Sequence, residues 1–144
     1  MTGIPVDLYA GTAPLRATHV GQLVTAPFDY DLVVSKNMAV INTAYNFYDP
    51  KPSYKFVITG ILMGGDRNIG NLGSLTVVYQ ATSPTTLTES RTIMSVDIAK
   101  NGTRDILPMN VLIDEGAYIN AKCDDNNVYV SITGYYIPLT VKHR

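Results

Sequence analysis

The sequence predicts an all-β protein built as an antiparallel β-sandwich. Runs rich in β-branched and aromatic residues recur along the chain, and short segments rich in Gly, Pro, Asn and Asp separate them. This is the pattern of consecutive strands joined by turns. The chain has 144 residues, a length typical of one domain that buries roughly two thirds of its unfolded surface.

The first 19 residues predict an extended N-terminal arm. No period of 2 or 3.6 residues holds across them, and Pro5 and Pro14 interrupt them. A disordered tail is the alternative, but solvated tails seldom carry many apolar residues. We therefore expect the arm to order against a neighbouring subunit through its apolar side chains, which are Ile4, Val6, Leu8, Tyr9 and Leu15.

Residues 20–144 are expected to form the folded domain, with eight strands. Their ranges are 21–26, 38–45, 54–63, 74–82, 92–99, 106–113, 117–123 and 127–137. The range 92–99 also fits a helical turn. Eight short antiparallel strands are the number of a jelly roll, and a seven-stranded immunoglobulin-like sandwich is the alternative.

Turn signals suggest how the later strands connect. Asn101-Gly102 predicts a hairpin, because both residues tolerate positive φ. Glu115-Gly116 and the segment 124–127, Asp-Asp-Asn-Asn, separate the last three strands. These three strands are therefore expected to pair as a meander between Ile106 and Pro138.

The range 54–63 is the most apolar in the chain. Strict alternation places apolar side chains on both of its faces, with Phe56, Ile58 and Leu62 on one and Val57, Ile61 and Met63 on the other. A strand of a solitary antiparallel sandwich should have one polar face. We therefore expect a partner to cover the outer face of this strand.

The composition excludes several classes of protein. Charged residues make up 16% of the chain, against a usual value of about 25%, which suggests that part of the surface is covered in the working state. The net charge of −1 lacks the basic excess of a nucleic-acid binder. The apolar runs fall short of the ~20 residues of a membrane helix. We expect no nucleic-acid partner and no membrane partner.

The single cysteine, Cys123, allows no internal disulfide. The first residues lack the basic and apolar regions of a signal peptide. Both observations indicate synthesis in a reducing cytoplasm.

The residue types that commonly carry catalysis are few and lie far apart along the sequence. His19 and His143 lie at opposite ends, and Cys123 is interpreted as a small buried residue. The Asp-Asp-Asn-Asn segment at 124–127 offers oxygen ligands for Ca²⁺ but is more typical of a turn. The glycine-rich loop 64–73 lacks the Gly-Lys-Ser/Thr of a phosphate-binding loop. We therefore expect no enzyme, no metal and no cofactor.

Three further residues are candidates for a protein interface. Arg67 lies in the glycine-rich loop, and arginine is enriched at interface hot spots. Alternation places Tyr136 in the core with Val128, whereas Tyr129 and Tyr135 fall on the opposite face. Tyrosine suits interfaces because it joins an apolar ring to a polar hydroxyl.

The closing strands carry a resemblance to a known group of proteins. Asp-Glu-Gly-Ala-Tyr-Ile-Asn-Ala-Lys at 114–122, with Val-Tyr-Val-Ser-Ile-Thr-Gly-Tyr-Tyr-Ile-Pro at 128–138, resembles the closing strands of small jelly-roll virion proteins of tailed bacteriophages. The likeness covers about residues 54–138. It is one of pattern, with no diagnostic residue, and supplies no catalytic residue.

The resemblance implies a structural virion protein, most specifically a capsid cement (decoration) protein. Such a protein oligomerises, here as a dimer or trimer, and binds between major capsid protein subunits or other virion proteins. A tail or fibre component, including a receptor- or glycan-binding module, is the alternative. A metal-dependent jelly-roll enzyme is disfavoured, because no histidine lies inside a predicted strand.

Overall fold

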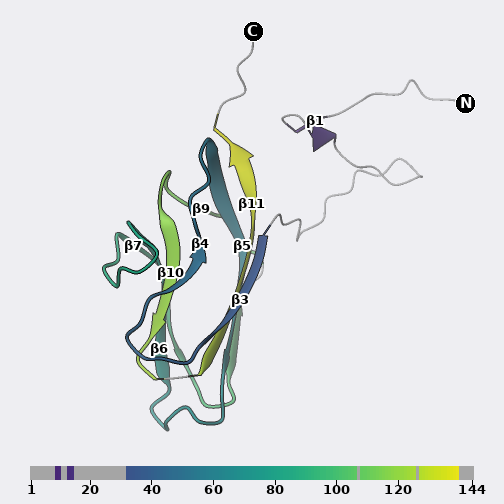
Figure 1. The fold of residues 1–144 in the computed structure, drawn as a ribbon. Coiled ribbons are helices and arrows are strands. Elements are labelled where there is room, and N and C mark those ends of the chain that lie inside the picture. Colours follow the sequence, from purple (N-terminus) through teal and green to yellow (C-terminus); the bar gives the residue numbers. More distant parts are fainter. Residues whose placement is uncertain (1–8, 11–12, 15–31, 107, 126, 140–144) are drawn as a thin grey trace, which may run out of the picture.

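The computed structural model describes residues 9–10, 13–14, 32–106, 108–125 and 127–139, and it confirms the β-sandwich. Two antiparallel sheets face each other (Figure 1). The described residues contain strands and turns but no helix, so no helix among them could span a membrane.

The first sheet, called sheet I, has the order β3-β11-β5-β8, with the short β9 also paired to β5. Its strands are β3 (Leu32–Met38), β5 (Tyr54–Gly65), β8 (Thr103–Ile106), β9 (Val111–Leu112) and β11 (Val128–Pro138). Sheet II has the order β4-β10-β6-β7. Its strands are β4 (Tyr45–Tyr48), β6 (Ser74–Ala81), β7 (Arg91–Ile98) and β10 (Tyr118–Cys123). Two further short strands, β1 (Tyr9–Ala10) and β2 (Ala13–Pro14), pair with each other.

The pairing of the strands identifies the sandwich as a jelly roll. The strands β8 and β9 pair with β5 at different heights and together occupy one strand position. The pairs are then nested: β3 with β11, β4 with β10, β5 with β8 and β9, and β6 with β7. The domain is thus one long hairpin, rolled so that successive pairs alternate between the sheets. The immunoglobulin-like alternative, with its different strand order, is wrong.

Two expected connections are wrong for the same reason. The last three strands do not form a meander, because β10 pairs with β4 and β6 in sheet II while β9 and β11 pair with β5 in sheet I. Asn101 takes positive φ, but it joins β7 in sheet II to β8 in sheet I. Asn101-Gly102 is therefore a crossover between sheets and makes no hairpin.

Several strand boundaries also differ from the prediction. The range 38–45 is mostly the turn between β3 and β4, and the strand lies earlier, at Leu32–Met38. Asn42 takes a positive φ of 49° there and donates from its backbone to the Cys123 carbonyl oxygen at 2.9 Å. Within the range 106–113, only Ile106 belongs to β8, and Val111–Leu112 form β9. Residues 92–99 are confirmed as a strand, and residues 21–26 lie outside the described residues.

A bulge in β5 explains why the strand looks apolar on both faces. Thr133 of β11 pairs with Gly60, and Gly134 pairs with Ile58, so Thr59 is the extra residue. A bulge of one residue reverses the faces of all later side chains. Four apolar side chains therefore point into the same core: Phe56, Ile58, Ile61 and Met63. The expectation that Leu62 lies beside Phe56 is wrong, because Leu62 points outward and is 41% exposed.

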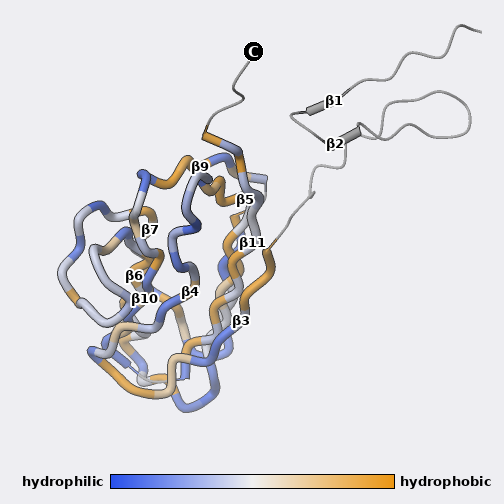
Figure 2. The backbone as a smooth tube through the Cα atoms, turned by 45° about the horizontal axis from the view of Figure 1, so that its top comes forward, coloured by the Kyte–Doolittle hydropathy of each residue, from blue (hydrophilic) through white to orange (hydrophobic). Residues whose placement is uncertain are grey.

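The core fills the space between the two sheets. Hydrophobic segments lie along strands of both sheets (Figure 2). Fully buried side chains meet from both sides, among them Met38, Phe56, Ile61, Val78, Ile98, Ile119 and Ile132. The sandwich therefore buries its inner faces without help from another molecule.

Replacing Gly134 with alanine is expected to lower the free energy of unfolding by about 1–3 kcal/mol. A Cβ there would lie 2.3 Å from Cζ of Phe56 and 2.3 Å from the carbonyl oxygen of Val57. Gly64→Ala is the matched control, because a Cβ at Gly64 meets nothing within 4 Å. Urea denaturation measures both variants, and equal effects would contradict the packing described for Gly134.

Candidate interaction face

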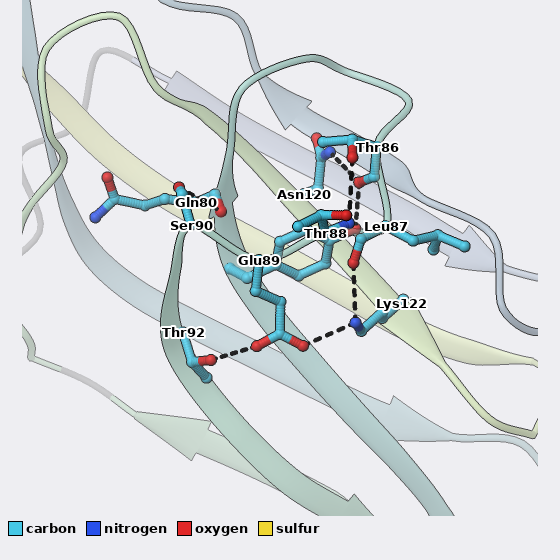
Figure 3. A network of polar contacts seen from close by, with 10 residues as sticks. Gln80, Thr86, Leu87, Thr88, Glu89, Ser90, Thr92, Asn120 and Lys122 are labelled. Atoms are coloured by element: carbon cyan, nitrogen blue, oxygen red, sulfur yellow. Dashed lines mark hydrogen bonds and ion pairs between the residues drawn. The ribbon is translucent and has the colours of Figure 1, made fainter.

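The outer face of sheet II is covered by a segment of its own chain. Residues 82–90, which connect β6 to β7 and are called the strap, lie across this face (Figure 3). Beneath it is a small apolar cluster of Val77, Tyr79 and Ala81, with Tyr118 packed against it. Tyr79 is fully buried although it points away from the core between the sheets.

Hydrogen bonds from the sheet hold the strap in place. The Tyr79 hydroxyl donates to the Thr86 carbonyl oxygen at 2.8 Å. The Asn120 amide donates to the carbonyl oxygens of Ser83 at 3.0 Å and Thr86 at 3.2 Å. Each of these bonds satisfies a carbonyl group of the strap, which a covering segment needs because buried carbonyls are costly when unpaired. Burial raises the pKa of Tyr79, so its hydroxyl stays protonated and keeps donating.

An ion pair holds the end of the strap that leads into β7. Nζ of Lys122 lies 2.7 Å from Oε1 of Glu89 and donates to the Leu87 carbonyl oxygen at 3.1 Å. Thr92 donates to the other carboxylate oxygen of Glu89. The hydrogen bonds from Lys122 and then from Thr92 lower the pKa of Glu89. The strap is thus fixed by both neutral and charged contacts (Figure 3).

The outer face of sheet I has no comparable cover among the described residues. Its side chains form cross-strand rows, because paired residues of neighbouring strands point to the same side. One row joins Tyr135, Val57 and Leu112. In the next row Ile137 pairs with Lys55. This end, called the apolar end, exposes Leu112 by 48% and Ile137 by 39% around the buried Val57.

The other end of the same face, called the polar end, is hollowed and lined mainly by polar residues, with the exposed Leu62 among them. Its rows are Ser35–Ser131–Leu62–Asp105 and Asn37–Tyr129–Gly64–Thr103. The ring of Tyr129 is half exposed and stands between two hollows. The β8 hollow, of about 440 Å³, lies between Tyr129 and β8. The β3 hollow, of about 290 Å³, lies between Tyr129 and β3.

The predicted interface residues lie in different parts of the structure. Tyr129 and Tyr135 both lie on the outer face of sheet I, at its polar and apolar ends. Tyr136 points inward, as predicted, with its ring 5.4 Å from that of Phe56. Arg67 is exposed in the loop between β5 and β6 and belongs to neither end.

The arm residues cannot be placed in the same way. Ile4, Val6, Leu8 and Leu15 lie outside the described residues, as do His19 and His143. Tyr9 belongs to β1, whose pairing with β2 is the only feature of the arm that the structure describes.

Asp124 and Asp125, which follow β10, bind the start of β6 and the β5–β6 loop. Oδ1 of Asp124 accepts from the Leu75 amide at 2.7 Å, and Oδ2 of Asp125 accepts from the Gly70 amide at 2.8 Å. Asn127 takes positive φ. No group of three or more His, Cys, Asp or Glu that could hold a metal ion occurs in the part of the chain that the structure describes.

Cys123 is buried, as predicted. Burial raises its pKa to about 11, and the neighbouring Asp124 adds to the effect. At neutral pH the thiol is protonated, whereas the thiolate is the reactive form.

Two features of the outer faces, one on each sheet, were not predicted from the sequence. The apolar end was missed because alternation, without the bulge, assigned Val57 to the face of Ile61. The strap was missed because Ser83-Pro84-Thr85-Thr86 predicts only a turn. In the sequence, Leu75, Val77, Tyr79 and Ala81 alternate with mostly polar residues, which predicts a half-buried strand with these four side chains on its buried face. That assignment is wrong, because Val77, Tyr79 and Ala81 form the outer cluster under the strap, and Val78 points into the core.

Comparisons with known proteins are limited to distant structural likenesses. No protein-family model matches the chain, and no curated protein matches it. A pentameric capsid protein from metagenomic phage sequences is similar over 96% of this chain and 82% of its own, at 16% identity and a TM-score of 0.37. The structure of infectious bursal disease virus, Gx strain, is similar over 90% of this chain and 36% of its own, at 12% identity and a TM-score of 0.32. Likenesses this distant carry no argument about function.

Replacing Glu89 with glutamine is expected to destabilise the protein at neutral pH by a few tenths to about 1 kcal/mol. Because the pKa of Glu89 is lowered by folding, its contribution is present above the unfolded-state pKa and is lost as the pH falls through the folded-state pKa. Urea midpoints of the two proteins should therefore differ at pH 7 and converge as the pH falls through the folded-state pKa of Glu89.

The exposed Glu115 provides the control for this experiment. Glu115→Gln removes a carboxylate from the turn before β10 without touching the strap. A difference between wild type and Glu89→Gln that stays constant from pH 7 to pH 3 would contradict the ion pair's role.

Proposed function

We propose that this is a structural virion protein that attaches to other virion proteins through the apolar end of the outer face of sheet I. The observation that carries the proposal is the contrast between the two sheets. Sheet II buries its outer apolar cluster under the strap, whereas sheet I leaves Leu112 and Ile137 exposed beside Tyr135.

The exposed side chains of the apolar end are not part of the core. Leu112 and Ile137 lie outside the core cluster, which is closed by the inward side chains of the same strands. Removing apolar surface from water stabilises a complex by about 25 cal/mol per Å². These exposed side chains would therefore stabilise a complex in which another protein covers them.

The virion setting rests on the resemblance of residues 54–138 and on the jelly-roll topology. Jelly rolls occur in viral capsid proteins, lectins and cupins, and fold alone does not decide between them. The packed interior argues against the metal-dependent enzymes of this architecture. The inner strand faces, where those enzymes carry their ligands, are filled here by side chains such as Phe47, Phe56 and Ile61.

Within this class, a capsid cement role fits best. The protein would self-associate and bind between major capsid subunits, so that each copy covers its apolar end against a neighbour. The N-terminal arm, with Ile4, Val6, Leu8, Tyr9 and Leu15, would add a second contact to an adjacent subunit. Arg67, exposed in the β5–β6 loop, would support that contact from the end of the sandwich.

The double variant Leu112→Ser, Tyr135→Ser is expected to weaken self-association by about tenfold or more, because each buried apolar side chain contributes about 1.5–3 kcal/mol. Sedimentation equilibrium measures the association constant. Leu87→Ser is the matched control, since Leu87 is 41% exposed on the strap, over the other sheet. A wild-type monomer, or equal association of both variants, would overturn the proposed interface.

Deletion of residues 1–19 is expected to weaken binding to particles while leaving the thermal unfolding of the sandwich unchanged. Binding is measured by co-sedimentation of the purified protein with particles stripped of it. Equal binding of the truncated and full chains would remove the arm from the proposal.

Mass spectrometry of purified virions distinguishes the cement role from a tail role. Hundreds of copies per particle are expected for a protein that binds between capsid subunits. A handful of copies would instead favour a tail or fibre component.

A further inference from the structure

We propose that the polar end of the outer face of sheet I is a saccharide-binding site in which Tyr129 stacks against sugar rings held in the β8 and β3 hollows. The inference goes beyond the structural role proposed above and does not depend on it. It follows from the shape of this end of the face and from the chemistry of its lining.

The β8 hollow exists because Tyr129, an aromatic residue, lies opposite a glycine on the neighbouring strand. Tyr129 lies on β11, the strand between β3 and β5, and its cross-strand partner on β5 is Gly64. Nothing lies within 4 Å of where a Cβ of Gly64 would be. The absent side chain leaves the β8 hollow open along one side of the Tyr129 ring.

The β3 hollow flanks the same ring on its other side. Ser35, Asn37 and Ser131 contribute to its lining. The hydroxyl oxygens of Ser35 and Ser131 are 2.6 Å apart, so short, mutually bonded side chains form its floor. One half-exposed aromatic ring therefore serves two hollows, of about 440 and 290 Å³.

The lining matches the surface of a sugar. A pyranose presents C–H groups on its ring faces, which pack on an aromatic ring, and hydroxyl groups around its rim. Hydroxyl groups are both donors and acceptors, so they pair with carboxylate, amide and hydroxyl side chains. Asp105, Thr103 and Ser131 offer such groups in the β8 hollow, and Asn37 and Ser35 offer them in the β3 hollow.

Other ligand classes fit this end less well. The lining carries Arg104 beside Asp105, and its other cation, Lys36, has its Nζ 5.8 Å from the centroid of the Phe47 ring, so the site lacks the row of cations that a nucleic-acid backbone requires. An apolar protein segment would leave the hydroxyl and carboxylate groups without partners, which costs free energy. A neutral oligosaccharide that spans both hollows satisfies the ring and the polar groups together.

The test is binding of the full chain to a printed array of defined oligosaccharides, followed by titration of the best-bound one by isothermal calorimetry. Tyr129→Ala is expected to weaken binding by about tenfold or more. Tyr129→Phe, which keeps the ring, should stay within about threefold of wild type.

A second variant fills the hollow without removing the ring. Gly64→Val places a β-branched side chain, favoured in strands, where no atom lies within 4 Å. It should fold normally by circular dichroism and lose binding to the same extent as Tyr129→Ala. Leu72→Ala, at a side chain that is 97% exposed in the β5–β6 loop, is the control and should bind the sugar like wild type.

The proposal is wrong if no oligosaccharide on the array binds wild type more strongly than it binds Tyr129→Ala. It is also wrong if Gly64→Val, shown to be folded, binds as well as wild type.

Discussion

The one-residue bulge between β5 and β11 is the constraint on which the two faces of sheet I depend. Without Thr59 as the extra residue, either Phe56 and Ile58 or Ile61 and Met63 would point away from the core. With it, all four side chains point inward, and the hydroxyls of Thr59 and Thr133 meet on the outer face, 3.0 Å apart. The bulge also divides that face, because the apolar end lies on one side of it and the hollowed end on the other.

The two sheets differ in how the apolar side chains on their outer faces are covered. Sheet II carries buried aromatic and aliphatic groups outside the sandwich and supplies its own cover, with Asn120 and Lys122 holding the strap. Sheet I presents small hydroxyl residues along much of its outer face, which water solvates well, and leaves apolar groups exposed both at its apolar end and, as Val33 and Leu62, along the rest of the face. A surface arranged in this way can contact a partner at one end while the other end stays open to solvent.

Features set by local pattern were predictable from the sequence, and features set by distant contacts were not. The strands near 54–63, 74–82 and 117–123 were found because their β-branched residues lie between strong turn signals. The turn at Asn42 was missed because its amide bonds to Cys123, which lies far away along the chain. Tyr129 and Tyr135 were placed on the correct face because alternation holds along β11. Their neighbours Leu112 and Gly64 depend on register with β5, which no local signal encodes.

The nested pairing also determines the order in which strand pairs can form during translation. β3 is made first among the strands of the sandwich, yet its neighbour in sheet I is β11, so it stays unpaired until residues 128–138 have been translated. The hairpin of β6 and β7 is the earliest pair within the sandwich that can form on the ribosome, since its strands are neighbours along the chain. Long-range strand pairing of this kind is slow, and its open strand edges invite wrong partners meanwhile. Slow translation or chaperone binding should therefore matter more for the yield of this protein than for that of a helical protein of equal size.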